Sequence, residues 1–398
     1  MRRIVFTASL LICLAGGSAE ARETFKIGVL TDVSGVFSDW SGPGSVVAAK
    51  LAIEDFRKTS PEFDVEIVVA DHQNKPDVAV AIAKRWAFEG VDLFADLTNS
   101  AIALSVSDVA RATNKAMIVN GSVANDLTGK ACSPNTVDWE TDAWALAHST
   151  TKSIVDLGGD TWFFLTSDFA AGRALEKEVA EVVEASGAKI IGGVRPALGL
   201  SDFSSFILQA QSSKAKIIGL SMSGADLVTV VKQFAEFGGQ VSSQKLAALV
   251  LRFNDVDALG LRSAQGLVFT NSYYWDLNAG TREFAARFAE RTKGKMPSDV
   301  QAGVYAGVLH YLKAVREKPT HDGRAIVAEM KAIPTEDLLF GKGRIRADGR
   351  VLHDIYVFEV KRPAETKGPY DYYKKLSVVE ATNAFRPMMK DCIFDAPQ

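Results

Sequence analysis

Residues 25–58, FKIGVLTDVSGVFSDWSGPGSVVAAKLAIEDFRK, contain the pattern that decides the fold. A short apolar run is followed by a glycine-rich turn and then by a stretch with helical spacing of apolar residues. Such a turn can cradle a phosphate group, but Pro43 removes a backbone donor and no lysine follows where a phosphate-binding one would lie. The spacing is also not that of a dinucleotide fingerprint. The stretch therefore predicts a strand, a turn and a helix, with Trp40 presented by the turn.

The same unit recurs along the chain. Runs of strand length alternate with helical patterns, for example over 77–89 and 174–186, and the runs are apolar throughout, as in parallel strands covered on both faces. These runs are KIGVL (26–30), VEIVVA (65–70), VDLFAD (91–96), AMIVN (116–120), TWFFLT (161–166), KIIGGV (189–194), AKIIGLS (215–221), LAALVL (246–251) and GLVFT (266–270). We predict an α/β protein with two doubly wound parallel-sheet halves.

The pattern changes after Tyr274. Helical spacing then predicts helices over 281–292, 300–316 and 326–332, and alternating residues with turn glycines predict a hairpin from Gly341. No low-complexity linker separates the two halves. We therefore expect the chain to cross between them more than once.

The first 21 residues have the pattern of a signal peptide. Two arginines precede an apolar run, and Ala19-Glu20-Ala21 matches a signal-peptidase site, so we expect cleavage after Ala21 and export to the periplasm. The apolar run is shorter than the ~20 residues that a bilayer requires, so no direct membrane insertion is expected. Ile12 before Cys13 disfavours a lipid anchor.

Composition and motifs exclude several functions. The chain of 398 residues is too long for one core and carries a formal charge of −3 without a basic run, which disfavours nucleic acid as a partner. Its five histidines form no metal-binding motif, and no GxSxG elbow or phosphate loop is present. Carboxylates that are adjacent in the sequence are expected on a solvated surface and not as a catalytic pair. We predict a protein that is not an enzyme and has neither a metal nor a cofactor.

The cysteines indicate a disulfide. Cys13 leaves with the signal peptide, and Cys132 and Cys392 have no CxxC spacing. In an oxidising compartment this favours one disulfide over a metal site. Two buried free thiols are the alternative.

Polar and aromatic residues follow the predicted strands, where ligands bind in open α/β sheets. Each could instead form a turn or a helix cap. Their recurrence in both halves predicts a shared cleft. In the first half they are Ser34, Ser38, Trp40, Thr98, Asn99, Ser100, Asn120, Gly121 and Ser122, and in the second half Ser167, Asp168, Phe169, Ser221, Met222, Ser223, Arg252, Phe253 and Asn254.

Several of these stretches together resemble a known family. They are residues 26–56, DHQNKPDVAVAIAKRW (71–86), LTNSAIALSVSDVA (97–110), IVNGSVANDLTG (118–129), LTSDFAAGRALEKEV (165–179) and MPSDVQAGVYAGVLHYLKAV (296–315). In them the chain resembles the type I periplasmic substrate-binding proteins of ABC importers, the class of the leucine/isoleucine/valine-binding proteins.

The resemblance implies two α/β lobes joined by three hinge segments that close around one small ligand. It also implies delivery of the ligand to an inner-membrane ABC permease, and we expect a monomer. The implied crossings lie near 138–144, 270–276 and 345–352. The implied lobes are 22–141 with 273–347, and 142–272 with 348–398.

The resemblance also assigns roles to site residues. In members that bind amino acids, groups matching Asn99, Ser100, Gly121 and Ser122 hold the α-carboxylate. Aromatic residues that match Trp40 and Phe169 pack on the ligand. An acidic residue for the ammonium is implied near 252–255, where this chain reads Arg-Phe-Asn-Asp, which puts an amino acid ligand in doubt.

The segment CSPNTVDW (132–139) resembles a branch of the family associated with small aromatic carboxylates. A pocket lined by Trp40, Trp139, Phe169 and Tyr273 or Tyr274 would suit a ring, although such aromatics can also be core or hinge packing. We therefore expect a solute-binding protein for a carboxylate-bearing ligand, an aromatic acid or an amino acid. The alternatives are a ligand-sensing module of the same fold and a binding protein for urea or short amides.

Overall fold

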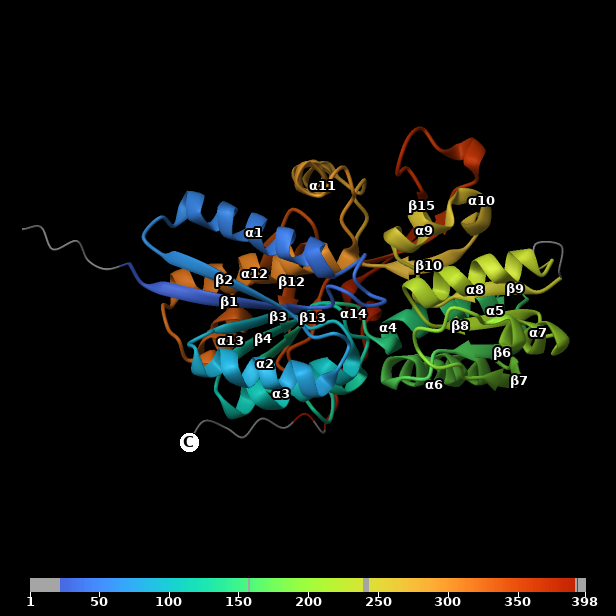
Figure 1. Ribbon diagram of the computed structural model, residues 1–398, viewed down its shortest axis with the longest axis horizontal. Coiled ribbons are helices and arrows are strands. Elements are labelled where there is room, and N and C mark those ends of the chain that lie inside the picture. The colour runs from blue at the N-terminus through green and yellow to red at the C-terminus, as the bar shows by residue number, and fades with distance from the viewer. Residues whose placement is uncertain (1–21, 157, 239–242, 391, 393–398) are drawn as a thin grey trace, which may run out of the picture.

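The computed structural model describes residues 22–156, 158–238, 243–390 and 392, so the predicted signal peptide lies outside the described residues. The first half of the chain forms a five-stranded parallel sheet in the order β2-β1-β3-β4-β5 (Figure 1). Its strands are β1 (Thr24–Thr31), β2 (Asp64–Asp71), β3 (Leu93–Asp96), β4 (Ala116–Val119) and β5 (Thr136–Asp138). The last of these strands was not among the predicted runs.

Helices cover both faces of this sheet. The helices α2 (Pro76–Phe88) and α3 (Ser100–Ala112) lie on one face, and α1 (Gly42–Thr59) lies on the other. Two late helices, α12 (Asp299–Glu317) and α13 (Gly323–Ala332), return to the α1 side, where α11 (Ala279–Arg291) also packs. Phe25, Ile27 and Val29 face these returning helices, so the first core is built from both ends of the chain.

The second half forms a four-stranded parallel sheet in the order β7-β6-β8-β9. Its strands are β6 (Thr161–Thr166), β7 (Lys189–Val194), β8 (Ile217–Ser221) and β9 (Lys245–Ala248). Trp162 and Phe164 pack toward α6 (Ala170–Ala185), whereas Phe163 and Leu165 pack toward α7 (Ser204–Ser212) and α8 (Ala225–Glu236). The short helices α4 (Ala143–Leu146), α5 (Lys152–Asp156), α9 (Phe253–Leu259) and α10 (Leu261–Ala264) complete this half, with a π-helical turn at Ala147–Thr151.

The prediction for the run GLVFT was wrong in its direction. Instead of joining the parallel sheet, β10 (Val268–Asn271) pairs antiparallel with β14 (Ile355–Val360), which pairs antiparallel with β15 (Tyr373–Val379). Gly266, with φ +78°, turns the chain just before β10. An apolar run specifies a buried strand but not the direction of its neighbour, which here comes from a segment about 90 residues later.

The predicted hairpin is present in the last third of the chain. In it β12 (Gly341–Ile345) pairs antiparallel with both β11 (Thr335–Asp337) and β13 (Val351–Leu352). Gly349 adopts φ +91° in the connecting turn, and a Cβ there would meet the carbonyl oxygen of Thr136 at 2.4 Å. This hairpin therefore packs on the first half of the molecule.

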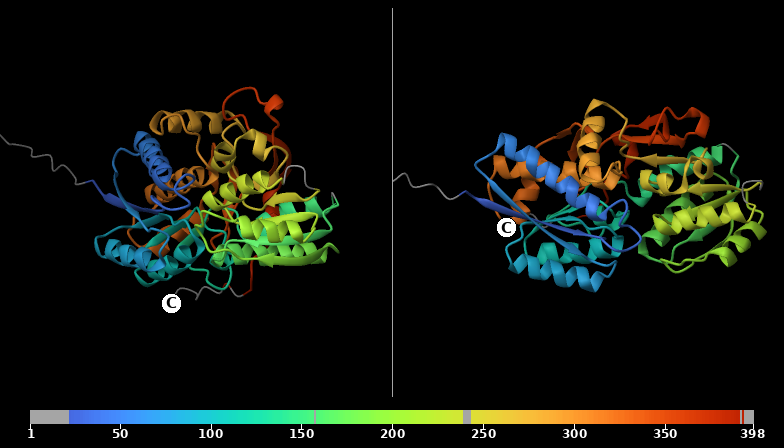
Figure 2. Two further views of the ribbon diagram at one scale, coloured as in Figure 1. Left: turned by 45° about the vertical axis from the view of Figure 1, so that its right-hand side comes forward. Right: turned by 45° about the horizontal axis from the view of Figure 1, so that its top comes forward.

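The two halves lie side by side and are joined by three stretches of chain (Figure 2). The chain leaves the five-stranded sheet at 139–142, returns at 272–278, and passes across again at 353–354. The third passage lies just beyond the expected segment 345–352. Arg350, which is fully buried, donates to Asp138 at 2.6 Å and to Asp142 at 3.1 Å, so it ties the first passage to the third.

The tail of the chain forms a further link. After β15, α14 (Ala381–Ala384) and Phe385 pack against Ala145, Leu352 and Ile355. The tail then reaches the loop before β5, where Cys392 is bonded to Cys132 across a sequence separation of 260 residues. The predicted disulfide is therefore present. Part of the segment 348–398, which we assigned to the second lobe, lies against the first.

Among the described residues, no helix is long and apolar enough to cross a membrane.

Candidate ligand-binding site

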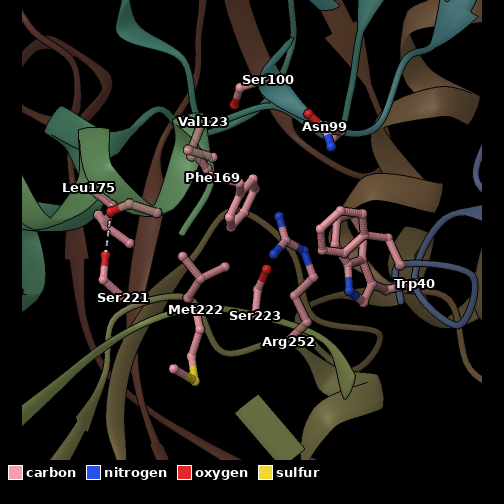
Figure 3. Close-up of a pocket in the computed structure, with 15 residues that line it drawn as sticks. Trp40, Asn99, Ser100, Val123, Phe169, Leu175, Ser221, Met222, Ser223 and Arg252 are labelled. Carbon is pink, nitrogen blue, oxygen red and sulfur yellow. Dashed lines mark hydrogen bonds between the residues drawn. The ribbon is translucent and has the colours of Figure 1, made fainter. Parts of the chain in front are cut away.

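A cavity lies between the two halves, where the carboxyl ends of their strands face each other (Figure 3). Its free volume is about 30 Å³, so the lining side chains leave little open space in it. Its lining residues are Phe37, Trp40, Asn99, Ser100, Gly121, Val123, Phe169, Ala171, Gly172, Leu175, Ser221, Met222, Ser223, Val250 and Arg252. Both halves therefore contribute to one site.

The connection between β3 and α3 supplies the polar side of the cavity. Asn99 has φ +86°, and its side chain accepts a hydrogen bond from the N–H of Ala101 at 3.0 Å, which caps α3. Ser100 opens the helix, and its hydroxyl accepts a hydrogen bond from Ser122 Oγ at 3.1 Å. The first turn of a helix has unpaired N–H groups and a positive dipole end, so this side of the cavity favours an anionic group.

Gly121 lets the β4 loop approach this connection closely. A Cβ at Gly121 would lie 2.8 Å from Thr98 Oγ1 and 3.1 Å from the Cα of Thr98. The N–H of Asn99 donates to the carbonyl of Gly121 at 3.3 Å. The two loops are thus held together as one polar wall.

The loop after β1 positions Trp40. The carboxylate of Asp32 accepts hydrogen bonds from the N–H groups of Gly35, at 2.8 Å, and Phe37, at 2.9 Å. Ser298 Oγ donates to the carbonyl of Trp40 at 2.6 Å. The indole packs on Phe37 with ring centroids 5.1 Å apart, so an aromatic wall is fixed from several sides.

The second half provides an opposing wall. Phe169 precedes α6, and its ring packs on that of Phe37 with ring centroids 6.2 Å apart. Met222 and Ser223 follow β8, and Figure 3 shows Ser223 beside Arg252. The cavity is therefore bounded by aromatic rings, with polar groups at separate places.

Arg252 is the one charged side chain among the lining residues of this cavity. It is 4% exposed, and its guanidinium lies over the ring of Trp40 with its carbon 4.1 Å from the ring centroid. Its Nε lies 3.3 Å from Asp299 Oδ1 at the start of α12. This geometry fixes a cation at the aromatic wall.

The acid implied near 252–255 does not reach the cavity. Asp255 is 3% exposed, and its Oδ2 accepts a hydrogen bond from the main-chain N–H of Arg252 at 2.9 Å, which caps α9. Burial raises the pKa of Asp255 to about 7. The loop therefore presents a cation to the cavity where amino acid binders are expected to present an anion.

Nine of the residues named for the predicted cleft line this cavity: Trp40, Asn99, Ser100, Gly121, Phe169, Ser221, Met222, Ser223 and Arg252. Among those that do not are Asn120, Ser122, Trp139, Asn254 and Tyr273. Ser122 supports Ser100, as described above. Asn254 instead lines a neighbouring surface hollow, and its Nδ2 donates to the carbonyl of Asp39 at 3.0 Å, across the two halves.

The remaining two aromatic candidates belong to the interior. Trp139 packs on the ring of His310, with centroids 5.8 Å apart, and Tyr273 packs on Phe284 and Phe340. Both are almost fully buried in the first core. Tyr274, the alternative to Tyr273, packs in the second core.

One group of possible metal ligands occurs among the described residues, formed by Asp32, Asp71 and His72. The carboxylate oxygens already accept hydrogen bonds from main-chain N–H groups and from Ser34. His72 Nδ1 accepts from the N–H of Asn74 at 3.1 Å. These hydrogen bonds show that the three side chains hold the β1–α1 loop in shape. The expectation that the protein binds no metal stays a prediction.

Comparisons with known proteins agree with this geometry. The family model for periplasmic binding proteins matches residues 24–368. The chain belongs to the periplasmic binding protein family. A periplasmic binding protein from Burkholderia mallei is 46% identical, covers 92% of this chain and 96% of its own, and superposes with a TM-score of 0.88.

Other solved structures of the same fold are similar to this periplasmic binding protein. A branched chain amino acid ABC transporter periplasmic ligand-binding protein from Burkholderia xenovorans is 34% identical, covering 93% of this chain and 100% of its own, with a TM-score of 0.81. A solute-binding protein from R. palustris, in complex with 4-hydroxybenzoate, is 20% identical, covering 90% and 97%, with a TM-score of 0.80. The comparison with curated protein sequences finds no match.

The chain is thus a solute-binding protein of the ABC transporter type, a class that binds small ligands and passes them to permeases. Such proteins are generally not enzymes.

Proposed function

We propose that this periplasmic binding protein captures a small organic anion with a ring, an aromatic acid in preference to an amino acid, for delivery to an inner-membrane permease. The observation that carries the proposal is Arg252, which is held against Trp40 in a cavity whose lining residues include no carboxylate. A buried ammonium group needs an acceptor or an anion. Next to a fixed guanidinium it would be repelled.

The walls support a flat ligand. Phe37, Trp40 and Phe169 bound the cavity, and aromatic rings pack favourably with other rings at ~4.5–7 Å between centroids. The carboxylate has two candidate partners, the start of α3 with Ser100 and the guanidinium of Arg252. Both favour negative charge.

The named ligands of similar structures do not decide between the two classes. The 34% identical protein is described as a branched chain amino acid transporter component. The structure with 4-hydroxybenzoate is only 20% identical and shows the fold alone. The proposal therefore depends on the charges and rings of this chain.

A ligand panel tests the proposal. Benzoate, 4-hydroxybenzoate, leucine, succinate, urea and acetamide would be added separately to the purified protein at pH 7.5, with unfolding followed by heat. A ring acid at 100 times its dissociation constant should add about 2.7 kcal/mol to the free energy of unfolding. Stabilisation by leucine, urea or acetamide with no effect of either ring acid would overturn the proposal.

A further inference from the structure

Three buried carboxyl groups converge on the one cation of the binding cavity. Glu140, Asp255 and Asp299 are 1%, 3% and 4% exposed, and they surround Arg252. They come from different parts of the chain: the first passage between the halves, the start of α9, and the start of α12. A region with three acids and one base cannot hold all of them ionised without a large desolvation cost.

One of the three acids has a positive partner, and a second has a main-chain donor. Asp299 Oδ1 lies 3.3 Å from Arg252 Nε, and Asp255 Oδ2 accepts the main-chain N–H of Arg252 at 2.9 Å. Arg252 Nε and Asp299 Oδ1 form a close charge pair without hydrogen-bond geometry, while the Arg252 side chain lines the cavity. Asp299 is in the position to orient Arg252 toward a ligand.

Glu140 is paired less completely. Ser272 Oγ lies 3.3 Å from its Oε2, and its Oε1 has no hydrogen-bond partner although it is buried. Gly303 of α12 packs so closely that a Cβ there would lie 2.7 Å from this Oε1 and 3.0 Å from Asn120 Nδ2, which is also unpartnered. A main-chain hydrogen bond with Thr141 also stabilises the carboxylate. Its Oε1 is nevertheless left without a partner, so the packed geometry favours the protonated form of Glu140.

The surrounding charges act in the same direction. Burial raises the pKa of Glu140 well above its usual range, the charge of Asp299 raises it further, and Arg252 opposes both. The charged side chains around Glu140 are those of Arg252, Asp299 and Asp138. Asp39 lies near Asp255, and Tyr373 lies near both Asp255 and Asp299. Arg350 and His353 contact the main-chain oxygens of Glu140 and Trp139.

The cluster is assembled by the approach of the two halves. Arg252 follows β9 of the second half, Asp299 begins α12 of the first, and Glu140 lies on the chain segment that connects them. We propose that Glu140 is a proton-binding residue of the ligand site, so that closure around an anion on Arg252 takes up one proton from solvent. The buffer acid loses its proton, an O–H bond forms on a carboxylate oxygen of Glu140, and no other bond changes. This inference rests on the proposed function.

The direction of the pH dependence follows from linkage. If the closed, ligand-bound state holds the proton more tightly than the open state, protonation favours binding. Affinity should then be constant at low pH and fall as the pH rises above the pKa of Glu140 in the open state, approaching tenfold per pH unit. The ligand carboxylate is already ionised in that window and does not contribute.

Calorimetry in two buffers tests the inference. Benzoate would be titrated into the full-length mature protein at pH 8 in phosphate and in Tris, whose ionisation enthalpies differ. We expect enthalpies that differ by an amount corresponding to uptake of close to one proton, and a benzoate dissociation constant that rises with pH. Glu140→Gln, a neutral mimic of the protonated acid, should show equal enthalpies in both buffers and a flat pH profile.

The control is Asp337→Asn, which changes a buried acid outside the cluster. Burial also raises the pKa of Asp337, but its Oδ1 accepts the N–H groups of Leu339 and Phe340 far along the chain from the cavity loops. This variant should take up as many protons as the wild type. Benzoate binding with equal enthalpies in the wild type, or unchanged uptake in Glu140→Gln, would overturn the inference alone. Failure of every ring acid to bind would instead overturn the proposed function and, with it, this inference.

Discussion

At the scale of single residues, Arg252 makes two contacts at once. Its guanidinium lies over Trp40 in the cavity, and its Nε lies 3.3 Å from Asp299 Oδ1. The first contact makes it a ligand-binding candidate and the second makes it part of the fold. A substitution of Arg252 therefore affects both ligand binding and the stability of the fold, and the two effects must be measured separately.

We predict that Arg252→Met weakens the binding of a ring acid by at least about 30-fold, because losing one partner of a buried charge pair costs about 2–5 kcal/mol. The same change leaves Asp299 buried without its cation and should lower stability by about 3–5 kcal/mol. The double variant Arg252→Met/Asp299→Asn removes both charges and should regain much of this stability without regaining affinity. Calorimetry and urea unfolding measure the two quantities.

Arg316→Met serves as the matched control, because Arg316 is exposed at the end of α12 and pairs with Glu317. It should change neither quantity measurably. Wild-type affinity in the double variant would remove Arg252 from the ligand site.

At the scale of elements, the β3–α3 connection stores backbone strain beside the cavity. Asp96, Leu97 and Asn99 have φ values of +78°, +58° and +86°. Non-glycine residues rarely adopt such values, and each costs of order 1–3 kcal/mol that the surrounding structure must offset. Here Ser41 Oγ donates to Asp96 at 2.9 Å, and the Asn99 side chain caps α3.

We predict that Asn99→Ala destabilises the protein by about 2 kcal/mol, because it removes the cap and places a β-carbon in an unfavourable conformation. Asn99→Gly should cost less than about 1 kcal/mol, because glycine tolerates the conformation and is an acceptable N-cap. Both variants should weaken ligand binding if the Asn99 side chain contacts the ligand. Urea unfolding compares them, and equal losses of stability would contradict the argument from strain.

The sequence predicted the positions of strands and helices better than it predicted the direction of strand pairing or which side chains face the cavity. Apolar runs identified the strands, because a strand buried on both faces needs no alternation. The antiparallel pairing of β10 was missed, because its partner β14 lies far along the chain. Trp139 and Tyr273 were assigned to the cavity but lie in the core, since both environments select large aromatic side chains.

The role of Arg252 in the binding site was likewise not predictable from the sequence alone. It was noted as a member of the loop after LAALVL, yet its role depends on Asp299, which only the fold brings near. The unexpected Arg-Phe-Asn-Asp sequence was the one available signal. That sequence indicates only that no acid is clearly presented. The structure shows that a basic side chain, that of Arg252, lines the cavity there.

At the scale of the whole molecule, the C-terminal strap, residues 381–390 and 392, adds a link between the halves to the three chain passages. Arg386 Nη2 donates to the carbonyl of Asn125 at 3.2 Å, and Cys392 is bonded to Cys132. The strap thus connects β15 of the antiparallel sheet to the loop before β5.

We predict that Cys132→Ser/Cys392→Ser lowers the free energy of unfolding by roughly 5 kcal/mol, the chain-entropy value for a very long loop. Urea unfolding of the variant, and of the wild type with and without reductant, measures this loss. The serine variant should not respond to reductant. A wild type whose stability is the same in reductant would show that the strap is held by packing alone.

The long separation of the two cysteines also sets an order of events during maturation. The bond joins positions 260 residues apart, and the strap rests on α4, β13 and β14, which come from both halves. The strap reaches its native position once α4, β13 and β14 are in place, so we expect oxidation late in folding. A molecule that stalls earlier keeps two reactive thiols, so thiol labelling during refolding would distinguish unfinished chains from mature ones.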